Sequence, residues 1–204
     1  MASTRRIGKE TSKTRALLLD ATERLMLEEG YAAVSSRRVA AAADVKPALV
    51  HYYFPTMDDL FVALFRRGAE RNMERITGAA ESEQPLRALW QLSNEQRGAV
   101  LMTEFTALSR HRTAVRSEIA AFGRRFRKLQ LRAIGRTLDR HGIDGSVVTA
   151  EAVAVLMTGL STTLTLEREV GMSTGHTQAV ALVEHLLHRY EPAPEPADAR
   201  QGLP

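Results

Sequence analysis

The stretch that decides the fold is VKPALVHYYFPTMDDLF, which runs from Val45 to Phe61. Pro47 suits the first turn of a helix, where a backbone N–H has no helical partner to lose. Pro55 ends that helix, and Thr56 with Asp59 forms the pattern of a capping box that starts another. The stretch therefore predicts a short helix, a sharp break and then a longer helix.

Two further helices are predicted before this stretch. Ser35 or Ser36 can cap a short helix in SRRVAAAA, with Val39 and Ala43 on its inner side. The helix before that one ends at Gly30, a suitable C-cap. Its apolar residues recur at helical spacing and are Leu17 or Leu18, Ala21, Leu25 and Met26. A short helix, a turn and a second short helix make a helix-turn-helix, whose last helix fits a DNA major groove.

His51, Tyr52 and Tyr53 stand together in a chain with only 5% aromatic residues. If Val50 faces the core and Phe54 closes it, helical geometry turns most of this cluster outward. The residues turned wholly or partly outward are Lys46, Pro47, Leu49, His51, Tyr52 and Tyr53. Imidazole and phenol groups can hydrogen-bond base edges or phosphates. A core role is the alternative for Tyr53 and Phe54, because a small three-helix unit needs large residues to close it.

The composition bounds the class of protein. The 204 residues are 44% hydrophobic, enough for a sizeable core, and their formal net charge of +4 suits an anionic partner. The chain has no Cys, which excludes disulfides, thiol catalysis and cysteine-ligated metal sites. No apolar run approaches the length of a membrane span. We therefore expect a cytoplasmic protein with no membrane partner and no cofactor.

Proline placement predicts an all-α fold. Four of the seven prolines fall in the C-terminal segment EPAPEPADARQGLP, which is polar and lacks periodicity, so we expect it to be disordered. Between Pro55 and that segment only Pro85 interrupts the chain, and residues with high helix propensity fill the rest. Long helices are expected over residues 60–76, 113–142, 150–166 and 177–190.

Residues 30–60, GYAAVSSRRVAAAADVKPALVHYYFPTMDDL, resemble the DNA-binding region of TetR-family transcriptional regulators of the TetR/AcrR type. The resemblance implies an N-terminal three-helix helix-turn-helix domain that a long helix joins to a C-terminal helical bundle for regulation and dimerisation. The expected division is a flexible basic N-terminal arm (1–12), the helix-turn-helix DNA-binding domain (13–62), a helical ligand-binding and dimerisation domain (63–190) and a disordered tail (191–204).

The same resemblance implies DNA contacts, position by position. They come from the start of the second helix, from the recognition helix and from the residue before the next helix. The residues are Ser35, Ser36, Arg37, Lys46, Pro47, Ala48, Leu49, His51, Tyr52, Tyr53 and Thr56. Arg37 suits a bidentate contact with guanine, with a solvated position as the alternative, whereas Arg38 is expected to face solvent.

Two positions depart from the family pattern. Asp44 stands where Gly is usual, and Asp tolerates a positive φ better than most residues. Met57 stands where a Lys that contacts phosphate is usual. A phosphate could instead be held by the N–H groups at the start of that helix. Charge could also come from the arm, whose basic residues are Arg5, Arg6, Lys9 and Lys13.

The helix expected over residues 113–142 has an apolar stripe and many basic residues. The stripe contains Ile119, Phe122, Phe126, Leu129 and Ala133. The other positions carry Arg124, Arg125, Arg127, Lys128, Arg132 and Arg136, which indicate a solvated face or, alternatively, a site for an anionic ligand or acidic partner. Residues able to line an apolar ligand pocket, or else to pack in the core, are Trp90, Met102, Phe105, Phe122, Phe126 and Met157.

The last two helices predict dimerisation. Gly159 and Ser161 permit close helix approach, and two helices from each subunit can form a two-fold four-helix interface, which the family resemblance also implies. The predicted interface residues are Val153, Leu156, Leu160, Leu164, Val180, Val183 and Leu187. Two recognition helices about 34–36 Å apart would then read a palindrome-like operator.

No catalytic or metal site is predicted. His185 and His188 lie near Glu184 on one helix, yet no further ligand residues accompany them. We expect a homodimeric transcriptional regulator, a repressor that a small and largely apolar molecule releases from double-stranded DNA. Two alternatives stay open. One is a DNA-binding protein of the same fold without a metabolite ligand, in an architectural or protein-recruiting role, and the other is a helical protein-interaction module.

Overall fold

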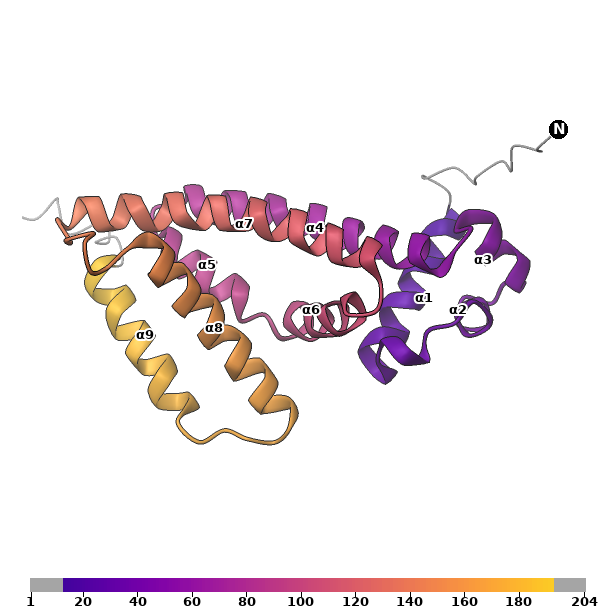
Figure 1. Cartoon of the computed structure of the whole chain (residues 1–204). Coiled ribbons are helices and arrows are strands. Elements are labelled where there is room, and N and C mark those ends of the chain that lie inside the picture. Colours follow the sequence, from indigo (N-terminus) through magenta and orange to yellow (C-terminus); the bar gives the residue numbers. More distant parts are fainter. Residues whose placement is uncertain (1–12, 193–204) are drawn as a thin grey trace, which may run out of the picture. The chain divides into compact units, whose positions relative to one another are not determined.

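The computed structural model describes residues 13–192, and within that range its regular secondary structure is entirely helical, as predicted (Figure 1). The helices are α1 (Lys13–Glu29), the short 3₁₀ helix η1 (Tyr31–Ala33), α2 (Ser36–Ala42), α3 (Pro47–Tyr53), α4 (Met57–Glu81), α5 (Pro85–Ser93), α6 (Gln96–Ser109), α7 (Thr113–Arg140), α8 (Ala150–Glu169) and α9 (His176–Tyr190). The predicted basic arm and residues 193–204 of the predicted tail lie outside the described residues. Within the described range, no helix combines the length and apolarity needed to cross a membrane.

The chain divides into two compact units. The first unit contains the chain up to residue 74 and residues 96–126, and the second contains residues 75–95 and the chain from 127 onward. Helices α4 and α7 therefore contribute residues to both units. The predicted domain boundary after residue 62 falls within α4, so the functional division stays a prediction.

The first unit packs around one apolar core. α1, α2, α3, α4, α6 and the start of α7 all contribute buried residues to it. Leu18 is buried and Leu17 is exposed, which fixes the orientation of α1 that the sequence left open. Burying one such large apolar side chain stabilises the fold by about 1.5–3 kcal/mol. Within residues 13–192, Thr22 is the one buried polar side chain of this unit, and its hydroxyl donates to the Leu18 carbonyl at 2.7 Å.

Two residues with positive φ shape the helix-turn-helix. Gly30 has a φ of 80° and a ψ of 165° directly after α1, a conformation that is essentially restricted to glycine, and its N–H donates to the Met26 carbonyl at 3.1 Å. Asp44 has a φ of 52° between α2 and α3. Across this turn the Val45 N–H donates to the Ala40 carbonyl at 2.9 Å, which closes the end of α2 in the manner of a Schellman motif. Asp is among the few side chains that adopt this conformation at small cost.

The second unit has a smaller and more polar interior. Its buried apolar residues are Ile76, Ala80, Leu86, Leu89, Trp90, Ala133, Ile134, Ala154, Leu164 and Leu187. Its buried polar residues are Gln130, Thr137, Ser161, Thr165 and Glu191. Ser161 on α8 donates to the Ser93 carbonyl at the end of α5 at 2.6 Å. α8 and α9 run in opposite directions and are joined by residues 170–175 (Figure 1).

Glu191 completes the second unit. Its carboxylate is buried and accepts the backbone N–H groups of Leu86 at 2.9 Å and Arg87 at 3.0 Å, at the start of α5. N–H groups in a first helical turn have no partner within the helix, so this carboxylate caps α5. The expectation of disorder is therefore wrong for Glu191, because local composition carries no sign of a partner about 100 residues earlier.

Candidate nucleic-acid interface

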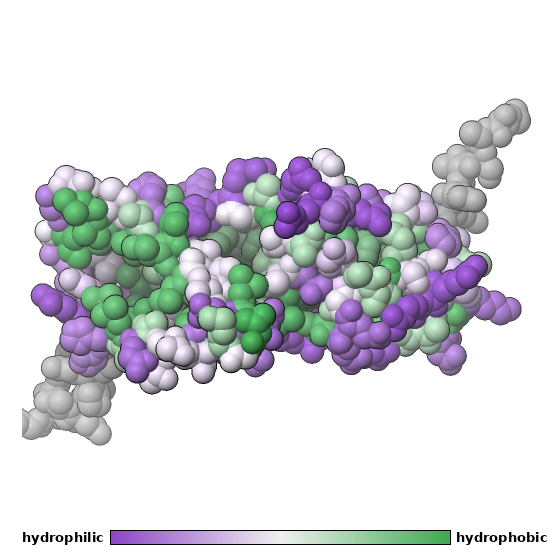
Figure 2. Space-filling view, turned by 60° about the horizontal axis from the view of Figure 1, so that its bottom comes forward, coloured by the Kyte–Doolittle hydropathy of each residue, from purple (hydrophilic) through white to green (hydrophobic). Residues whose placement is uncertain are grey.

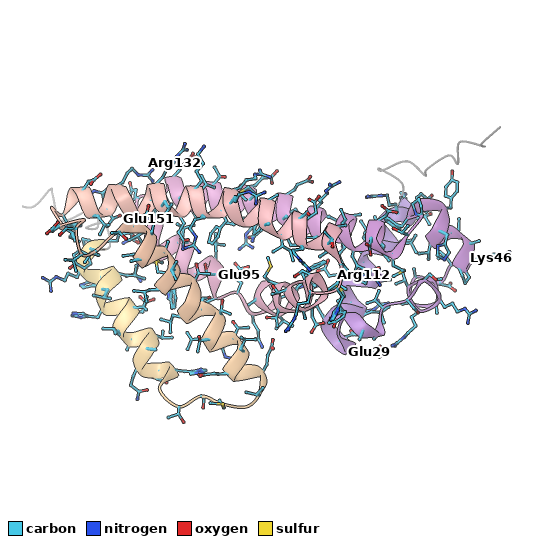
Figure 3. The ribbon with its side chains drawn as sticks, viewed as in Figure 1. Glu29, Lys46, Glu95, Arg112, Arg132 and Glu151 are labelled. Carbon is cyan, nitrogen blue, oxygen red and sulfur yellow. The ribbon has the colours of Figure 1, made fainter. Side chains whose placement is uncertain are left out.

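α3 presents an exposed surface with a buried inner side. Val50 and Phe54 are buried in the core of the first unit, and Val45 packs against that core half-buried. The predicted contact residues in or next to α3 that are exposed are Lys46, Pro47, Ala48, Leu49, His51 and Tyr52. Figure 3 shows Lys46 at the outer edge of this surface. Since the core does not require these side chains, they are available to a partner.

Tyr52 and Tyr53 have different surroundings. Tyr52 is 47% exposed. Tyr53 is half-buried against the core, and its ring meets that of Tyr52 edge to face with centroids 5.1 Å apart. The Arg15 guanidinium lies 5.1 Å from the centre of the Phe54 ring, which further fixes this end of α3. Tyr53 therefore fits the core alternative and supports Tyr52, which points outward.

The start of α2 leaves one arginine available. Ser35 caps the helix, because its hydroxyl accepts the Arg38 N–H at 3.3 Å, and Ser36 is half-buried. The Arg38 guanidinium pairs with Glu29, and their hydrogen bond raises the pKa of Arg38. Arg37 is exposed and forms no hydrogen bond or ion pair within the described part of the chain. Its donors can therefore reach a base or a phosphate.

The start of α4 satisfies its own polar groups. The predicted capping box is present: the Asp59 N–H donates to Thr56 Oγ1 at 3.1 Å, and the Thr56 N–H donates to Asp59 Oδ2 at 2.9 Å. Asp58 pairs with Arg112 at 2.6 Å, and Met57 is half-buried against the core. Thr56 itself is exposed. The carboxylates of Asp58 and Asp59 repel anions, which disfavours the phosphate contact predicted at these N–H groups.

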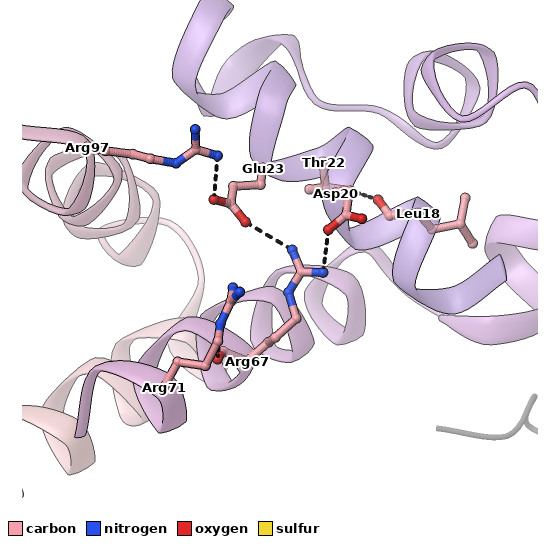
Figure 4. A network of polar contacts seen from close by, with 7 residues as sticks. All are labelled: Leu18, Asp20, Thr22, Glu23, Arg67, Arg71 and Arg97. Carbon is pink, nitrogen blue, oxygen red and sulfur yellow. Dashed lines mark hydrogen bonds and ion pairs between the residues drawn. The ribbon is translucent and has the colours of Figure 1, made fainter. Parts of the chain in front are cut away.

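Ion pairs connect α1 to α4 and α6 within the first unit (Figure 4). Arg67 of α4 donates to Asp20 at 2.6 Å and to Glu23 at 2.9 Å. Arg97 of α6 donates to the other oxygen of Glu23 at 2.8 Å. Because Glu23 is mostly buried and has two cationic partners, this network is stronger than isolated surface pairs.

A second connection joins α6 to the end of α1. The Glu104 carboxylate accepts the Tyr31 N–H at 2.6 Å. It also lies 3.3 Å from the place that a Cβ would occupy on Gly30. Gly30 therefore provides both the positive φ of the turn and the room for this contact. α6 was predicted to belong to the regulatory domain, yet it contacts the helix-turn-helix directly.

The residues predicted to line a ligand pocket are divided between the two units. Met102, Phe105, Phe122 and Phe126 belong to the first unit, and Trp90 and Met157 belong to the second. Phe65 meets Phe105 and Phe122 edge to face at 5.1 and 5.9 Å, so these two residues serve the core. One open hollow of about 200 Å³ borders Phe122. The rest of its lining is Phe65, Arg66, Ala69, Glu70, Glu118, Ala121 and Arg125, which is too charged for an apolar site.

Some of the predicted dimer-interface residues of α8 and α9 are buried in their own chain, and others are exposed. Leu164 and Leu187 are buried in their own chain, whereas Leu156 is 71% exposed. Val153, Leu160 and Val183 are half-buried, and Val180 is exposed. Periodicity finds the apolar positions of a helix but not which of them meet the rest of the chain. Four more apolar residues of α8 and α9 are exposed that the apolar spacing did not single out, and they are Val155, Leu166, Leu182 and Leu186. Figure 2 shows apolar side chains on the face that carries these helices.

Most basic residues of α7 face solvent, as predicted. The exposed ones are Arg124, Arg125, Lys128, Arg132 and Arg136, and Figure 3 shows Arg132 pointing away from the helix. Arg127 is the exception. Its Nη1 atom is buried and has no hydrogen-bond partner within residues 13–192. Arg127 therefore does not fit the solvated-face alternative, because the basic run turns through almost a full circle around the helix, and the alternative of an anionic ligand or acidic partner stays open for this residue.

The histidines do not form a metal site within the described residues. His185 and His188 are both exposed on α9, while Glu184 pairs with Arg87. Among residues 13–192, no group of three or more potential metal ligands lies together.

Comparisons with known proteins agree with this geometry. Residues 18–64 match the model of the tetR family of bacterial regulatory proteins. The chain is similar to a proposed TetR-family transcriptional regulator from Rhodococcus sp., with 19% identity, a TM-score of 0.70, and coverage of 88% of this chain and 100% of that chain.

Two further solved structures share the fold. A proposed transcriptional regulator from Streptomyces coelicolor A3(2) is 26% identical, with a TM-score of 0.64 over 89% of this chain and 100% of that chain. The transcriptional regulator FadR from Bacillus subtilis, solved in complex with stearoyl-CoA, is 16% identical, with a TM-score of 0.60 over 88% of this chain and 99% of that chain. No curated protein matches the sequence.

Proposed function

The chain belongs to the TetR family of transcriptional regulators, and from this premise we propose that it is a homodimeric repressor. It binds a palindrome-like operator and leaves the DNA when a small molecule binds. The observation that carries DNA recognition is the outward surface of α3: Val50 is buried and anchors the helix, whereas the other residues from Lys46 to Tyr52 are exposed. A repressor must reach its DNA operator, so we assign this protein to the cytoplasm, where that DNA lies.

Base and phosphate contacts are assigned to different parts of the helix-turn-helix. Arg37 has unengaged donors for a guanine or a phosphate. His51 and Tyr52 offer polar ring groups at the solvent side of α3, and Lys46 offers a positive charge for the phosphate backbone. Ser35 and Thr56 already use their side chains as helix caps, so their contribution to DNA affinity is smaller.

Dimerisation is assigned to the exposed apolar face of α8 and α9. Soluble monomers rarely expose large contiguous apolar patches, and such a patch marks an interaction site. Leu156 on α8 is exposed, as are Leu182 and Leu186, which are one turn apart on the same side of α9, and this supports a two-fold contact between copies of the chain. A dimer presents two copies of α3, as a palindrome-like operator requires.

Release by a small molecule is the second part of the proposal. FadR from Bacillus subtilis, which has the same fold, was solved with stearoyl-CoA, and this supports effector binding by the helical region. An effector releases the operator if it binds the DNA-incompatible conformation more tightly than the DNA-bound one. Among the predicted pocket residues we retain Trp90 and Met157, which belong to the second unit, and not Phe105, which packs in the core of the first unit.

Selection from random duplex DNA tests the proposal. Purified protein would be incubated with the duplex pool at physiological salt and with competitor DNA, and the retained DNA would be sequenced. We expect a palindromic consensus. Arg37→Ala should cost about 1–3 kcal/mol at each half-site. Arg38→Ala is the matched control, because Arg38 is already paired with Glu29 and should change affinity much less.

The outcomes separate the alternatives. A pool without an enriched sequence, bound weakly and only at low salt, would mean charge-driven contact and would favour the protein-interaction module. A consensus with no compound-dependent release would favour the architectural or recruiting protein.

A further inference from the structure

The inner side of α7 in the second unit is unusually polar. Arg127, Gln130, Ile134 and Thr137 follow one another at spacings of three, four and three residues, the spacing of a helix seam that faces a core. Gln130 is 2% exposed, Ile134 is fully buried and Thr137 is 2% exposed. Of the buried α7 residues in this unit, Ala133 and Ile134 are apolar but Gln130 and Thr137 are polar, and the need for apolar burial alone does not explain the polar ones.

Two polar groups of this seam have no partner. Arg127 Nη1 and Gln130 Oε1 are buried and form no hydrogen bond with any residue from 13 to 192. The two residues are three apart, so their side chains are neighbours on one helix face. Arg67 in the first unit shows the contrast: its Nε atom is also unpaired, but its other two nitrogens bind the carboxylates of Asp20 and Glu23.

Other buried polar side chains of the second unit are satisfied. Ser161 donates to the Ser93 carbonyl at 2.6 Å, and Thr165 donates to the Ser161 carbonyl at 3.0 Å. Thr137 donates to the Ala133 carbonyl at 3.3 Å. Leaving a buried donor or a cationic nitrogen unpaired is costly, and native proteins rarely do so without a functional reason. The unpaired atoms of Arg127 and Gln130 are therefore a local feature.

We propose that Arg127 and Gln130 form the polar anchor of the effector site, and that the effector is an apolar molecule carrying a carboxylate. This inference rests on the proposed function. A guanidinium binds a carboxylate with charge-assisted hydrogen bonds. The Gln130 amide can turn to present its NH₂ group to the same carboxylate. Ala133 and Ile134, buried one turn further along α7, provide apolar surface for the rest of the molecule.

The first test uses the protein without ligand. Arg127→Met replaces a half-buried cation, whose Nη1 atom is buried without a partner, by an apolar side chain of similar length, so we expect the melting temperature to rise by about 2–4 °C. Gln130→Leu should act in the same direction. Arg132→Met is the matched control, because Arg132 lies on the exposed side of the same helix and its replacement should leave the melting temperature unchanged. A fall in the melting temperature of Arg127→Met would overturn the proposal, since it would show that Arg127 is paired in the folded protein.

The second test compares carboxylates with alcohols of the same carbon skeleton. Octanoate and 1-naphthoate are paired with octan-1-ol and 1-naphthalenemethanol, and each compound is added to the protein in a thermal-shift titration. We expect at least one carboxylate to stabilise the wild type at a concentration at least tenfold below its alcohol. Arg127→Met should abolish that difference, and Arg132→Met should keep it.

Equal responses to acid and alcohol in the wild type, or a preference for the acid that survives Arg127→Met, would overturn the inference. DNA selection is a separate readout. A wild-type protein that yields a palindromic consensus but ignores the carboxylates would refute the anchor and leave the regulator proposal standing. A wild-type protein that yields no palindromic consensus would refute the regulator proposal instead.

Discussion

The two compact units differ in how far their own residues provide hydrogen bonds for buried polar groups and cover for large apolar side chains. The first unit surrounds one apolar core. Its buried polar side chain in residues 13–126, that of Thr22, is hydrogen-bonded, and Arg67, which has one unpaired nitrogen, binds two carboxylates through its other two. The second unit buries Gln130, Thr137, Ser161, Thr165 and Glu191 beside a smaller apolar core. It also exposes large apolar residues on α8 and α9.

This difference indicates where each unit meets its partners. A unit with a complete core can present its remaining side chains outward, as α3 does, without loss of stability. A unit with unpaired interior atoms and apolar residues in solvent gains stability when something else contributes the missing contacts. We therefore expect the first unit to be stable by itself, and the proposed second copy and ligand to stabilise the second unit.

Breaking the complete core should have the largest effect. Phe61 is 2% exposed in the first unit, and Phe61→Ala should lower the free energy of unfolding by about 3–5 kcal/mol, because it leaves a cavity in a tightly packed interior. Urea denaturation followed by circular dichroism would measure the loss. Val147→Ala, at an exposed position in the second unit, should change stability by less than about 0.5 kcal/mol. A loss under 1 kcal/mol for Phe61→Ala would show that this core is loosely packed.

The exposed apolar face of the second unit can be tested by adding charge. Leu156→Glu should weaken dimerisation by about 2–4 kcal/mol, because it places carboxylates in the proposed two-fold contact. Sedimentation velocity across a concentration series would measure the shift to monomer, and circular dichroism should show unchanged helix content. Val147→Glu, which is more exposed but lies before α8, is the control. A Leu156→Glu protein that stays dimeric would place the interface elsewhere.

A single contact between α6 and the helix-turn-helix should have an intermediate effect. Glu104→Ala removes the carboxylate that accepts the Tyr31 N–H, and we expect a loss of about 1.5–3 kcal/mol in unfolding free energy. Faster amide exchange at Tyr31 would locate the change. Glu95→Ala is the comparison in the second unit, where the pair with Arg75 is exposed and should contribute at most about 1 kcal/mol. If both variants lose the same unfolding free energy, the Glu104 contact is worth no more than the exposed Glu95 pair, and the prediction is wrong.

The smallest effect should come from a solvent-screened pair. The Arg66 guanidinium lowers the pKa of Glu118, chiefly through their hydrogen bond. The stabilisation from this pair is therefore present above the ordinary Glu pKa of about 4.3 and is lost as pH falls through the lowered folded-state value. Arg66→Ala should raise the pKa of Glu118 and cost about 0.2–1 kcal/mol at neutral pH. NMR titration of the Glu118 carboxyl in the wild type and in Arg66→Ala would measure the change in pKa. The same pKa in both proteins would show that the pair does not form in solution.

The helix-turn-helix was predictable because short-range chemistry determines it. Pro47, Pro55 and the Thr56–Asp59 box fix the limits of α3 and α4 through backbone geometry that neighbouring residues specify. Gly30 and Asp44 adopt positive φ for equally local reasons. The outward surface of α3 follows from the position of Val50 and Phe54.

Long-range packing explains what the sequence did not predict. Arg127 belongs to the basic run RRFRK, and which of these residues turns inward depends on helices that are distant in sequence. Leu164 and Leu187 have the same periodicity as Leu156, yet contacts within the chain bury the first two and leave the third exposed. Glu191 caps a helix more than 100 residues earlier, a pairing that no local pattern contains.

The cap that Glu191 provides also sets an order of events during protein synthesis. The residues of the first unit have all been translated once residue 126 has left the ribosome, but α5 cannot receive its cap until residue 191 has followed. At about 5–20 residues per second, that delay is about 3–13 s. During this interval the nascent chain can already display a folded helix-turn-helix, while the part that would control it is still being made.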